Sequence, residues 1–169
     1  LPSVAPSTTN TTGLANPPAF AARLEEIAKL AEGEGAVLFI DLDDFKAVND
    51  DVGHLAGDHV LEVVGDRLGR ALRPGDLVAR FGGDEFAVLC ERLTDVDTAG
   101  AVADRLLAAL SAPIVLDDGR EVTITGSIGI TELGRSEEPE AILARADLAM
   151  RDAKARGRNR WVAVPPPLP

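Results

Sequence analysis

The stretch "RFGGDEFAVLC", Arg80 to Cys90, decides the fold of this chain. Gly82 and Gly83 separate two apolar segments, which indicates a tight hairpin, because only glycine enters positive φ without steric cost. A hairpin does not need the two acids that follow. Asp84 and Glu85 therefore indicate a site at the mouth of a buried strand. Successive side chains on a strand point to opposite faces, so the two acids are expected to do different jobs.

The rest of the chain alternates between helical and strand patterns of apolar residues. The run 36–40 is continuously apolar, as in a central strand covered on both faces. Strands and helices interleave, with two hairpins in the middle. This predicts an α/β or α+β sandwich, with one mixed or antiparallel sheet covered by helices. The expected helices are 17–30, a short one ending at Val48, 55–72, 96–110 and 139–154, and the expected strands are 36–40, 77–81, 86–90, 114–116, 121–124, 126–131 and 160–164.

Composition limits the classes of function. The chain has 169 residues, is 46% hydrophobic and carries a net charge of −11. That suits one domain, with residues 1–12 as a linker-like head and 165–169 as a Pro-rich tail. The negative charge argues against nucleic acid or an anionic membrane surface as a partner. The single cysteine, Cys90, suits a reducing compartment and reads as a buried apolar residue rather than a reactive thiol. No transmembrane run or signal peptide is visible, so we expect a cytoplasmic protein.

Acids also follow the expected central strand, in "FIDLDDFKAVND", residues 39–50. Asp41 and Asp43 at the end of a strand suit Mg²⁺, which usually takes one or two protein carboxylates together with substrate phosphates. Asp84 would supply a second carboxylate if the two strands are neighbours. The alternative is that these acids cap helices and solvate a loop. An EF-hand reading fails, because Lys46 and Val52 stand where that loop needs Gly and Glu.

Three other polar segments contain residues that can serve either the structure or a binding site. In "NDDVGHLAGD", expected to be a loop, Asn49 and Asp58 can read the edge of a guanine or form a turn and a cap, and His54 reads as a structural hydrogen-bonding residue. Lys154 and Arg158 are four apart, so they share a face if the helix persists, either to complement the helix dipole or to hold phosphates. Arg73 and Asp76 flank a Pro-Gly turn and can form an exposed ion pair.

Together these segments resemble the GGDEF domain of diguanylate cyclases, which takes its name from the residues that stand here as Gly82-Gly83-Asp84-Glu85-Phe86. The resemblance covers residues 13–164 as one catalytic domain. It implies a central, mostly antiparallel five-stranded sheet wrapped by helices, similar to polymerase palms and nucleotide cyclases. The further matching segments are Asp41 to Lys46, Asn49-Asp50, Gly53-His54, Gly57-Asp58, Arg80-Phe81, Ser127 to Gly129, Ala146-Asp147, Ala153-Lys154 and Gly157 to Asn159.

The resemblance also implies an activity. Two GTP molecules would be joined into cyclic di-GMP with release of two pyrophosphates, at the interface of a homodimer in which each subunit binds one GTP. The cofactor would be Mg²⁺, with Mn²⁺ as a substitute. The domain would belong to a bacterial signalling protein, with an upstream sensor or dimerisation domain outside this chain and with no membrane contact of its own.

Site residues carry over position by position. Asp41 and Asp84, with the Leu42 carbonyl, would hold Mg²⁺, and Asp43 would share in a second metal. Glu85 would help to deprotonate the attacking 3′-hydroxyl or hold metal. The product would inhibit the enzyme through Arg73-x-x-Asp76. The substrate-binding set would be Asn49 and Asp58 for guanine, Leu14, Phe45, Lys46 and Leu61 for the pocket lining, Gly82 and Gly83 near the phosphates, and Lys154 and Arg158 as phosphate ligands.

Two departures from the family pattern stand out. The family usually opens with Asp-x-Leu-Thr-Gly-Leu-x-Asn-Arg, whereas here Thr9 and Pro17 occupy the ends of that pattern. We expect a looser opening segment. Arg151 stands where the last helix usually carries Tyr. The alternatives to an active cyclase are a weak or inactive domain that serves as a receptor for GTP or cyclic di-GMP, and an unrelated cyclase with a single-nucleotide product; the match of Asn49 and Asp58 disfavours the latter.

Overall fold

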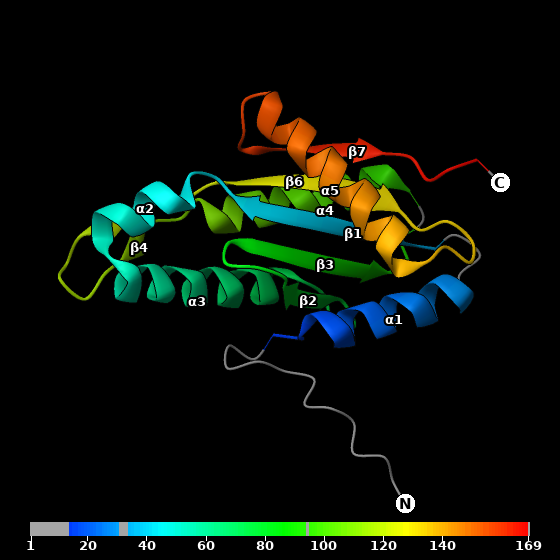
Figure 1. Ribbon diagram of the computed structural model, residues 1–169, viewed down its shortest axis with the longest axis horizontal. Helices are drawn as coiled ribbons and strands as arrows, with labels where there is room; N and C mark the ends of the chain where they lie inside the picture. Colours follow the sequence, from blue (N-terminus) through cyan, green and yellow to red (C-terminus); the bar gives the residue numbers. More distant parts are fainter. Residues whose placement is uncertain (1–13, 31–33, 94, 169) are drawn as a thin grey trace, which may run out of the picture.

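The computed structural model describes residues 14–30, 34–93 and 95–168 (Figure 1). Helices and strands alternate along most of the chain, as the sequence predicts. The helices are α1 (Pro17–Leu30), α2 (Phe45–Val52), α3 (His54–Ala71), α4 (Val96–Leu110) and α5 (Pro139–Ala155). The strands are β1 (Gly35–Leu42), β2 (Leu77–Arg80), β3 (Glu85–Glu91), β4 (Ile114–Val115), β5 (Glu121–Val122), β6 (Gly126–Glu132) and β7 (Arg160–Val164).

Five strands form one sheet in the order β2-β3-β1-β6-β7, and β4 pairs with β5 in a separate hairpin. All neighbours in the large sheet are antiparallel except β6 and β7. The parallel pair is joined through α5, because parallel strands need a crossover connection. The expected five-stranded, mostly antiparallel sheet wrapped by helices is confirmed.

The central strand β1 separates two apolar layers. Alternate residues of β1 enter a cluster with α3 and α4, whereas Val37 and Phe39 pack with α1 and α5. Figure 1 shows α5 and α1 in front of the sheet and α4 behind it. This coverage on both faces explains the continuous apolar run that predicted a central strand. It also places Asp41, on the face of Val37 and Phe39, under α5.

The structure corrects several details of the sequence prediction. Residues 49–58 are not a loop, because α2 continues to Val52 and α3 begins at His54. The two helices meet at Gly53 alone, whose φ of 87° lies in the region that favours glycine. Leu30, at the end of α1, and Leu55, at the start of α3, are largely exposed. None of the described helices has the length and apolarity needed to cross a membrane.

The opening segment is described only from Leu14 onward. Ala15 forms a parallel bridge with Ala79, and its N–H donates to the Val78 carbonyl at 3.1 Å. The Asn16 side chain accepts from the Ala19 N–H at 2.9 Å and so caps α1. The head 1–12 and the first part of the substituted pattern, residues 9–13, lie outside the described residues, so the expected looseness there stays a prediction.

One close approach fixes the position of α5 over the sheet. A Cβ added to Gly129 on β6 would overlap the Ala146 carbonyl oxygen and the Met150 nitrogen, and would lie 2.9 Å from the Ala149 carbonyl carbon. All three are backbone atoms of α5, so they cannot rotate away. Only glycine at this position allows the helix to pack this closely on β6.

We therefore expect Gly129→Ala to lower the free energy of unfolding by about 1–3 kcal/mol, because overpacking a rigid contact costs this order. Urea denaturation monitored by circular dichroism measures the change. The control is Gly69→Ala in α3, where an added Cβ meets nothing within 4 Å. That variant should gain about 0.5–1 kcal/mol from helix propensity. Equal stabilities of the two variants would contradict the packing argument.

Candidate functional site

Strand register brings the predicted acids together at one end of the sheet. Asp41 stands opposite Glu85 on β3 and opposite Ser127 on β6. Directly paired residues of antiparallel strands share a face, so the Asp41 and Glu85 side chains lie on the same side of the sheet. The Leu42 N–H donates to the Asp84 carbonyl at 3.0 Å, which fixes the turn residue beside the end of β1.

The turn before β3 is held by side-chain contacts rather than by unusual backbone angles. Arg80 donates from Nε to the Gly82 carbonyl at 3.0 Å and from Nη2 to the Gly83 carbonyl at 2.9 Å. Neither glycine has a positive φ, so the conformational reason expected for them is wrong. A Cβ on Gly82 would instead lie 3.1 Å from Glu85 Oε2. Gly82 therefore leaves room for the Glu85 carboxylate.

Asp41 is the most exceptional acid of the site. Its Oδ1 is the only buried side-chain oxygen or nitrogen of the described residues that accepts or donates no hydrogen bond. Lys154 Nζ lies 3.2 Å from this oxygen as an ion-pair partner, without hydrogen-bond geometry. Burial raises the pKa of the Asp41 carboxyl, Lys154 opposes this rise, and the nearby Asp84 and Asp43 charges add to it.

This arrangement fits a divalent cation that completes its coordination with substrate. No three His, Cys, Asp or Glu side chains within 14–30, 34–93 and 95–168 are placed to hold a metal by themselves. Mg²⁺ does not need such a set, because it usually takes one or two carboxylates, waters and phosphate oxygens. The Oδ1 of Asp41, which accepts no hydrogen bond, matches that requirement, and Asp84 is close enough to raise the pKa of the Asp41 carboxyl.

Glu85 is also perturbed. Burial raises the pKa of its carboxyl, and the charges of Asp41, Asp84 and Asp147 raise it further, while Arg151 opposes them. Arg151 itself is paired with Asp147 across one turn of α5, with Nη2 3.1 Å from Oδ2. The position that departs from the family pattern therefore contributes to the field at Glu85. A carboxyl with a raised pKa suits proton transfer near neutral pH.

Asp43 differs sharply from Asp41, although only Leu42 separates them. Its Oδ1 accepts from Ser127 Oγ at 2.7 Å, and its Oδ2 accepts from Thr125 Oγ1 at 2.7 Å and from the Asn159 N–H at 3.0 Å. Lys154 Nζ stands 3.9 Å from Oδ1. Every one of these neighbours is a donor or a cation, so both oxygens of this carboxylate are already used within the protein.

The basic cluster lies at the C-terminal end of α5. Lys154 is in the last turn of the helix, but the helix ends at Ala155, so Arg158 does not share its face as the sequence suggested. Arg158 has a φ of 64° and reaches Asp44, with Nε 3.8 Å from Oδ1. Lys154 points at the acids and Arg158 is half-exposed at the rim. Lys154 is therefore the more buried of the two cations, and Arg158 is the more exposed one.

The predicted guanine readers lie on α2 and α3. Asn49 Nδ2 is 2.9 Å from His54 Nδ1, so donation from the amide leaves the histidine proton on Nε2. A Cβ on Gly57 would overlap Asn49 Oδ1, so glycine is needed there for this amide orientation. Asp58 is exposed one residue further along α3. The structural reading of His54 fits this contact.

The predicted lining residues divide into apolar and exposed positions. Leu14, Phe45 and Leu61 are buried in the cluster that also contains β1, α3 and α4. Lys46, beside Phe45 at the start of α2, is exposed. The apolar three thus form part of the core. Cys90 is buried in the same cluster, and burial raises the pKa of its thiol to about 12, as expected for an unreactive cysteine.

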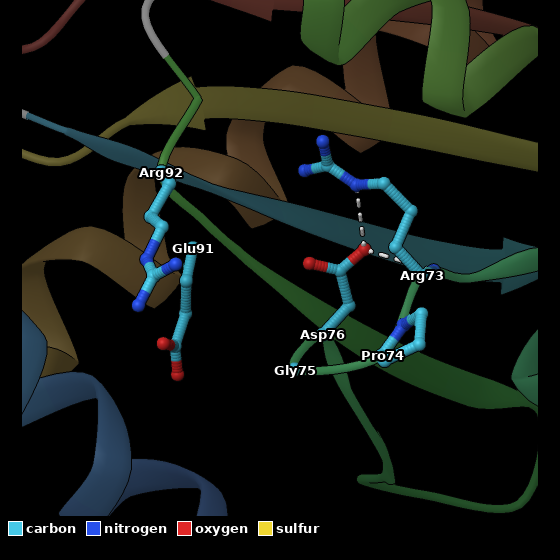
Figure 2. Close-up of a pocket in the computed structure, with 6 residues that line it drawn as sticks. All are labelled: Arg73, Pro74, Gly75, Asp76, Glu91 and Arg92. Atoms are coloured by element: carbon cyan, nitrogen blue, oxygen red, sulfur yellow. Dashed lines mark hydrogen bonds and ion pairs between the residues drawn. The ribbon is translucent and has the colours of Figure 1, made fainter.

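A pocket of about 320 Å³, here called the second pocket, lies apart from the cluster of acids described above (Figure 2). Figure 2 shows Arg73 and Asp76 on one side of it and Glu91 and Arg92 on the other. Asp76 Oδ2 accepts from the Arg73 N–H at 3.2 Å and lies 3.6 Å from Arg73 Nε. The Asp76 side chain is 3% exposed, whereas that of Arg73 is 49% exposed. The buried acid therefore orients a guanidinium that still faces solvent.

Sequence reasoning assigned no role to several residues of the site. Thr125, Ser127 and Asn159 surround Asp43, and Arg80 holds the glycine turn. Small hydroxyl side chains on strands carry no signal of their own until the register is known. Arg80 offered a weak signal, because an arginine directly before a glycine turn can reach its carbonyls.

Comparisons with known proteins agree with the geometry. The profile described as "Diguanylate cyclase, GGDEF domain" matches residues 9–160. Diguanylate cyclase DgcP of Pseudomonas aeruginosa is 43% identical over 152 residues, which are 88% of this chain and 22% of that protein. Cyclic di-GMP phosphodiesterase NbdA of the same organism is 44% identical over 129 residues, which are 75% of this chain and 16% of that protein. The chain therefore spans less than a quarter of these relatives.

A solved structure extends the similarity to the fold. The GGDEF domain of DgcB from Caulobacter crescentus, in complex with c-di-GMP, superimposes with a TM-score of 0.86 at 30% identity. The match covers 94% of this chain and 94% of that one.

The raised pKa of Glu85 predicts how the stability of the metal-free protein depends on pH. Between the ordinary pKa of about 4.5 and the raised folded value, the native state binds more protons than the unfolded state, so stability falls as pH rises through this window. We therefore expect Glu85→Gln to raise the melting temperature at pH 7. The difference should shrink when the pH drops below about 4.5.

Scanning calorimetry in EDTA at several pH values measures this effect. The matched control is Glu62→Gln, because Glu62 is an exposed carboxylate on α3. That variant should melt close to the wild-type temperature at pH 7. A lower melting temperature for Glu85→Gln at pH 7 would contradict the electrostatic account.

Proposed function

The chain belongs to the GGDEF domain family of diguanylate cyclases, and from that membership we propose that it condenses two GTP molecules into cyclic di-GMP. In each of two equivalent steps, the 3′-hydroxyl oxygen of one GTP attacks the α-phosphorus of the other. A phosphodiester bond forms, the bond to pyrophosphate breaks, and the hydroxyl proton is taken up by a base. The observation that carries the proposal is the buried Oδ1 of Asp41, which accepts no hydrogen bond and lies beside Glu85 and the Lys154 ammonium.

We assign the acids distinct roles. Asp41 and Asp84, with the Leu42 carbonyl, would hold Mg²⁺, or Mn²⁺ in its place. When bound, the ion supplies charge neutralisation at the phosphates and lowers the pKa of the attacking hydroxyl. Glu85 accepts the hydroxyl proton, since its raised pKa makes it a better base near neutral pH than an ordinary carboxylate.

Lys154 and Arg158 bind phosphate oxygens in this proposal. Lys154 neutralises Asp41 in the free protein, with its Nζ 3.2 Å from Oδ1. Once another cation neutralises Asp41, Lys154 can turn to the nucleotide. Arg158 is half-exposed and held only loosely by Asp44, so its guanidinium is available to a phosphate. An acidic protein can bind a polyanion here because these cations reverse the local sign.

Asn49 and Asp58 select guanine. A carboxylate accepts from the N–H donors of the base, and the orientation of the Asn49 amide is held by His54 and by the missing Cβ of Gly57. Lys46 would help to bind the nucleotide at the start of α2, and Leu14, Phe45 and Leu61 would pack beneath it. Gly82 and Gly83 let phosphates approach the backbone of the turn.

The product needs two guanines, whereas one chain offers one pair of readers. We therefore propose that catalysis takes place in a homodimer, with one GTP on each subunit. The relatives are several times longer than this chain, which supports an upstream sensor or dimerisation domain in the intact protein. Because GTP is its substrate, we place the domain in the cytoplasm, where it would serve bacterial signalling alone or as part of a larger membrane-anchored protein.

A second candidate function is a receptor for GTP or cyclic di-GMP with weak or no catalysis. It is favoured by the similarity to a protein named as a cyclic di-GMP phosphodiesterase. The presence of Asp41, Asp84 and Glu85 at the ends of β1 and β3 favours the cyclase, because a receptor does not need three acids at one strand end.

Incubation with GTP and Mg²⁺, followed by chromatography, tests the proposed reaction. We expect cyclic di-GMP and pyrophosphate in a ratio of one to two. The rate should rise as about the square of protein concentration below the dimerisation constant. Asp84→Ala should lower the rate by about a hundredfold or more. GTP binding without any product at high protein concentration would support the receptor instead.

Product inhibition through the second pocket is tested by Arg73→Ala. The guanidinium, oriented by buried Asp76, suits a guanine or phosphate of cyclic di-GMP. The variant should keep the initial rate and lose about tenfold or more in sensitivity to added product. The control is Arg70→Ala, because Arg70 is exposed on α3 and pairs with the exposed Asp66 one turn away. Unchanged sensitivity in Arg73→Ala would remove this assignment.

A further inference from the structure

We propose that Asp43 is a positioning residue that fixes the phosphate-binding cations relative to the catalytic acids, and that it is not a metal ligand. The inference rests on the proposed function, because it concerns how the same site holds a triphosphate. It starts from the contrast between two acids of one strand end. Asp41 has a buried oxygen without a hydrogen bond, whereas Asp43 accepts three.

The geometry leaves no place for a metal on Asp43. Its side chain is 4% exposed, and Oδ2 accepts both the Thr125 hydroxyl and the Asn159 N–H. Oδ1 accepts the Ser127 hydroxyl and faces Lys154. A cation on Oδ2 would displace the Thr125 hydroxyl or the Asn159 N–H, and the latter belongs to the backbone and cannot turn away alone. A cation on Oδ1 would have to take the place of the Lys154 ammonium or of the Ser127 hydroxyl.

These contacts join three separate parts of the fold. The Asp43 N–H donates to the Thr125 carbonyl at 2.8 Å, which holds the end of β1 beside the start of β6. Ser127 pairs in register with Asp41 on β1 and with Arg160 on β7. Asn159 directly precedes β7. One carboxylate thus connects the strand that carries Asp41 with the turn that leads into β7.

The turn after α5 needs such a connection. Arg158 and Asn159 both have positive φ, at 64° and 48°, which side-chain-bearing residues rarely adopt in succession. The helix end supplies hydrogen bonds for the first part only, because the Arg158 N–H donates to the Ala153 carbonyl and the Gly157 N–H to the Lys154 carbonyl. The Asn159 N–H has Asp43 as its acceptor.

The position of Arg158 at the edge of the site therefore depends on the hydrogen bond from the next residue, Asn159, to Asp43. Lys154 is affected as well, since its ammonium lies between Asp41 and Asp43, at 3.2 and 3.9 Å. Removing the Asp43 charge leaves Lys154 paired with Asp41 alone. The expected defect is weaker binding of the β- and γ-phosphates, with little change in binding of the guanosine part.

Two substitutions separate the effect of the Asn159–Asp43 hydrogen bond, here called the tether, from the effect of the Asp43 charge. In Asp43→Asn, the carbonyl can still accept from Asn159, and the amide can donate to the Ser127 hydroxyl oxygen, so the turn is retained while the charge is lost. In Asp43→Ala, both are lost. The control is Asp50→Asn on α2, because Asp50 is exposed and outside the site. It changes the net charge equally.

Calorimetric binding of GTP and GMP in EDTA tests the proposal without metal or turnover. We expect the GTP affinity to fall about fivefold in Asp43→Asn and about twentyfold in Asp43→Ala, with GMP affinity within about twofold of wild type and Asp50→Asn unchanged. A metal-ligand role predicts a loss only with Mg²⁺, seen with the non-reacting 3′-deoxy-GTP. An effect that vanishes in EDTA overturns the proposal, and so does an equal loss for GTP and GMP.

Amide hydrogen exchange of the free protein tests the tether independently of any nucleotide. The Asn159 N–H should be protected in the wild type and in Asp43→Asn, and should exchange about tenfold faster or more in Asp43→Ala. If wild type binds neither GTP in EDTA nor 3′-deoxy-GTP with Mg²⁺, the proposed function fails, and the exchange result still decides whether Asp43 holds the turn. Equal protection of Asn159 in wild type and Asp43→Ala overturns the inference.

Discussion

The antiparallel pairing of β1 with both β3 and β6 is the constraint on which the site depends. It sets Asp41 opposite Glu85 and Ser127, and it forces several carboxylates into one half-buried region. Burial raises the pKa values of both Asp41 and Glu85, and repulsion between the neighbouring carboxylates raises them further. The apolar layers on both faces of β1 supply the stability that holds these acids in place.

The site resolves this repulsion in two different ways. Asp43 is neutralised within the protein, by two hydroxyls, a backbone N–H and the nearby Lys154. Asp41 keeps one oxygen without a hydrogen bond, and the Lys154 ammonium lies 3.2 Å from that oxygen. A fully satisfied acid serves structure, whereas an unsatisfied one is a place where a ligand gains most. Asp41 and Asp43 are the same residue type, so the difference between their roles follows from their hydrogen bonds.

Most elements could be predicted from the sequence, since their apolar spacing is regular. The helices 17–30 and 96–110 and the strand 160–164 have the expected bounds. The corner at Gly53 was missed, because a single glycine between two helices resembles a loop when polar residues surround it. The pairing of Asp41 with Glu85 could not be predicted from the chain alone, because register depends on contacts between strands far apart in sequence. The network around Asp43 depends on that register and on the turn at Arg158 and Asn159.

The sheet edges carry a consequence for self-association. Strand β2 is only four residues long, and Ala15 already bridges it at Ala79, while β7 runs directly into the prolines 165–167, which lack an N–H. Short, covered or proline-terminated edges discourage the addition of further strands from other molecules. Two copies of this domain would therefore meet through their helices and loops, and their contact could open and close without any rearrangement of the β-sheet.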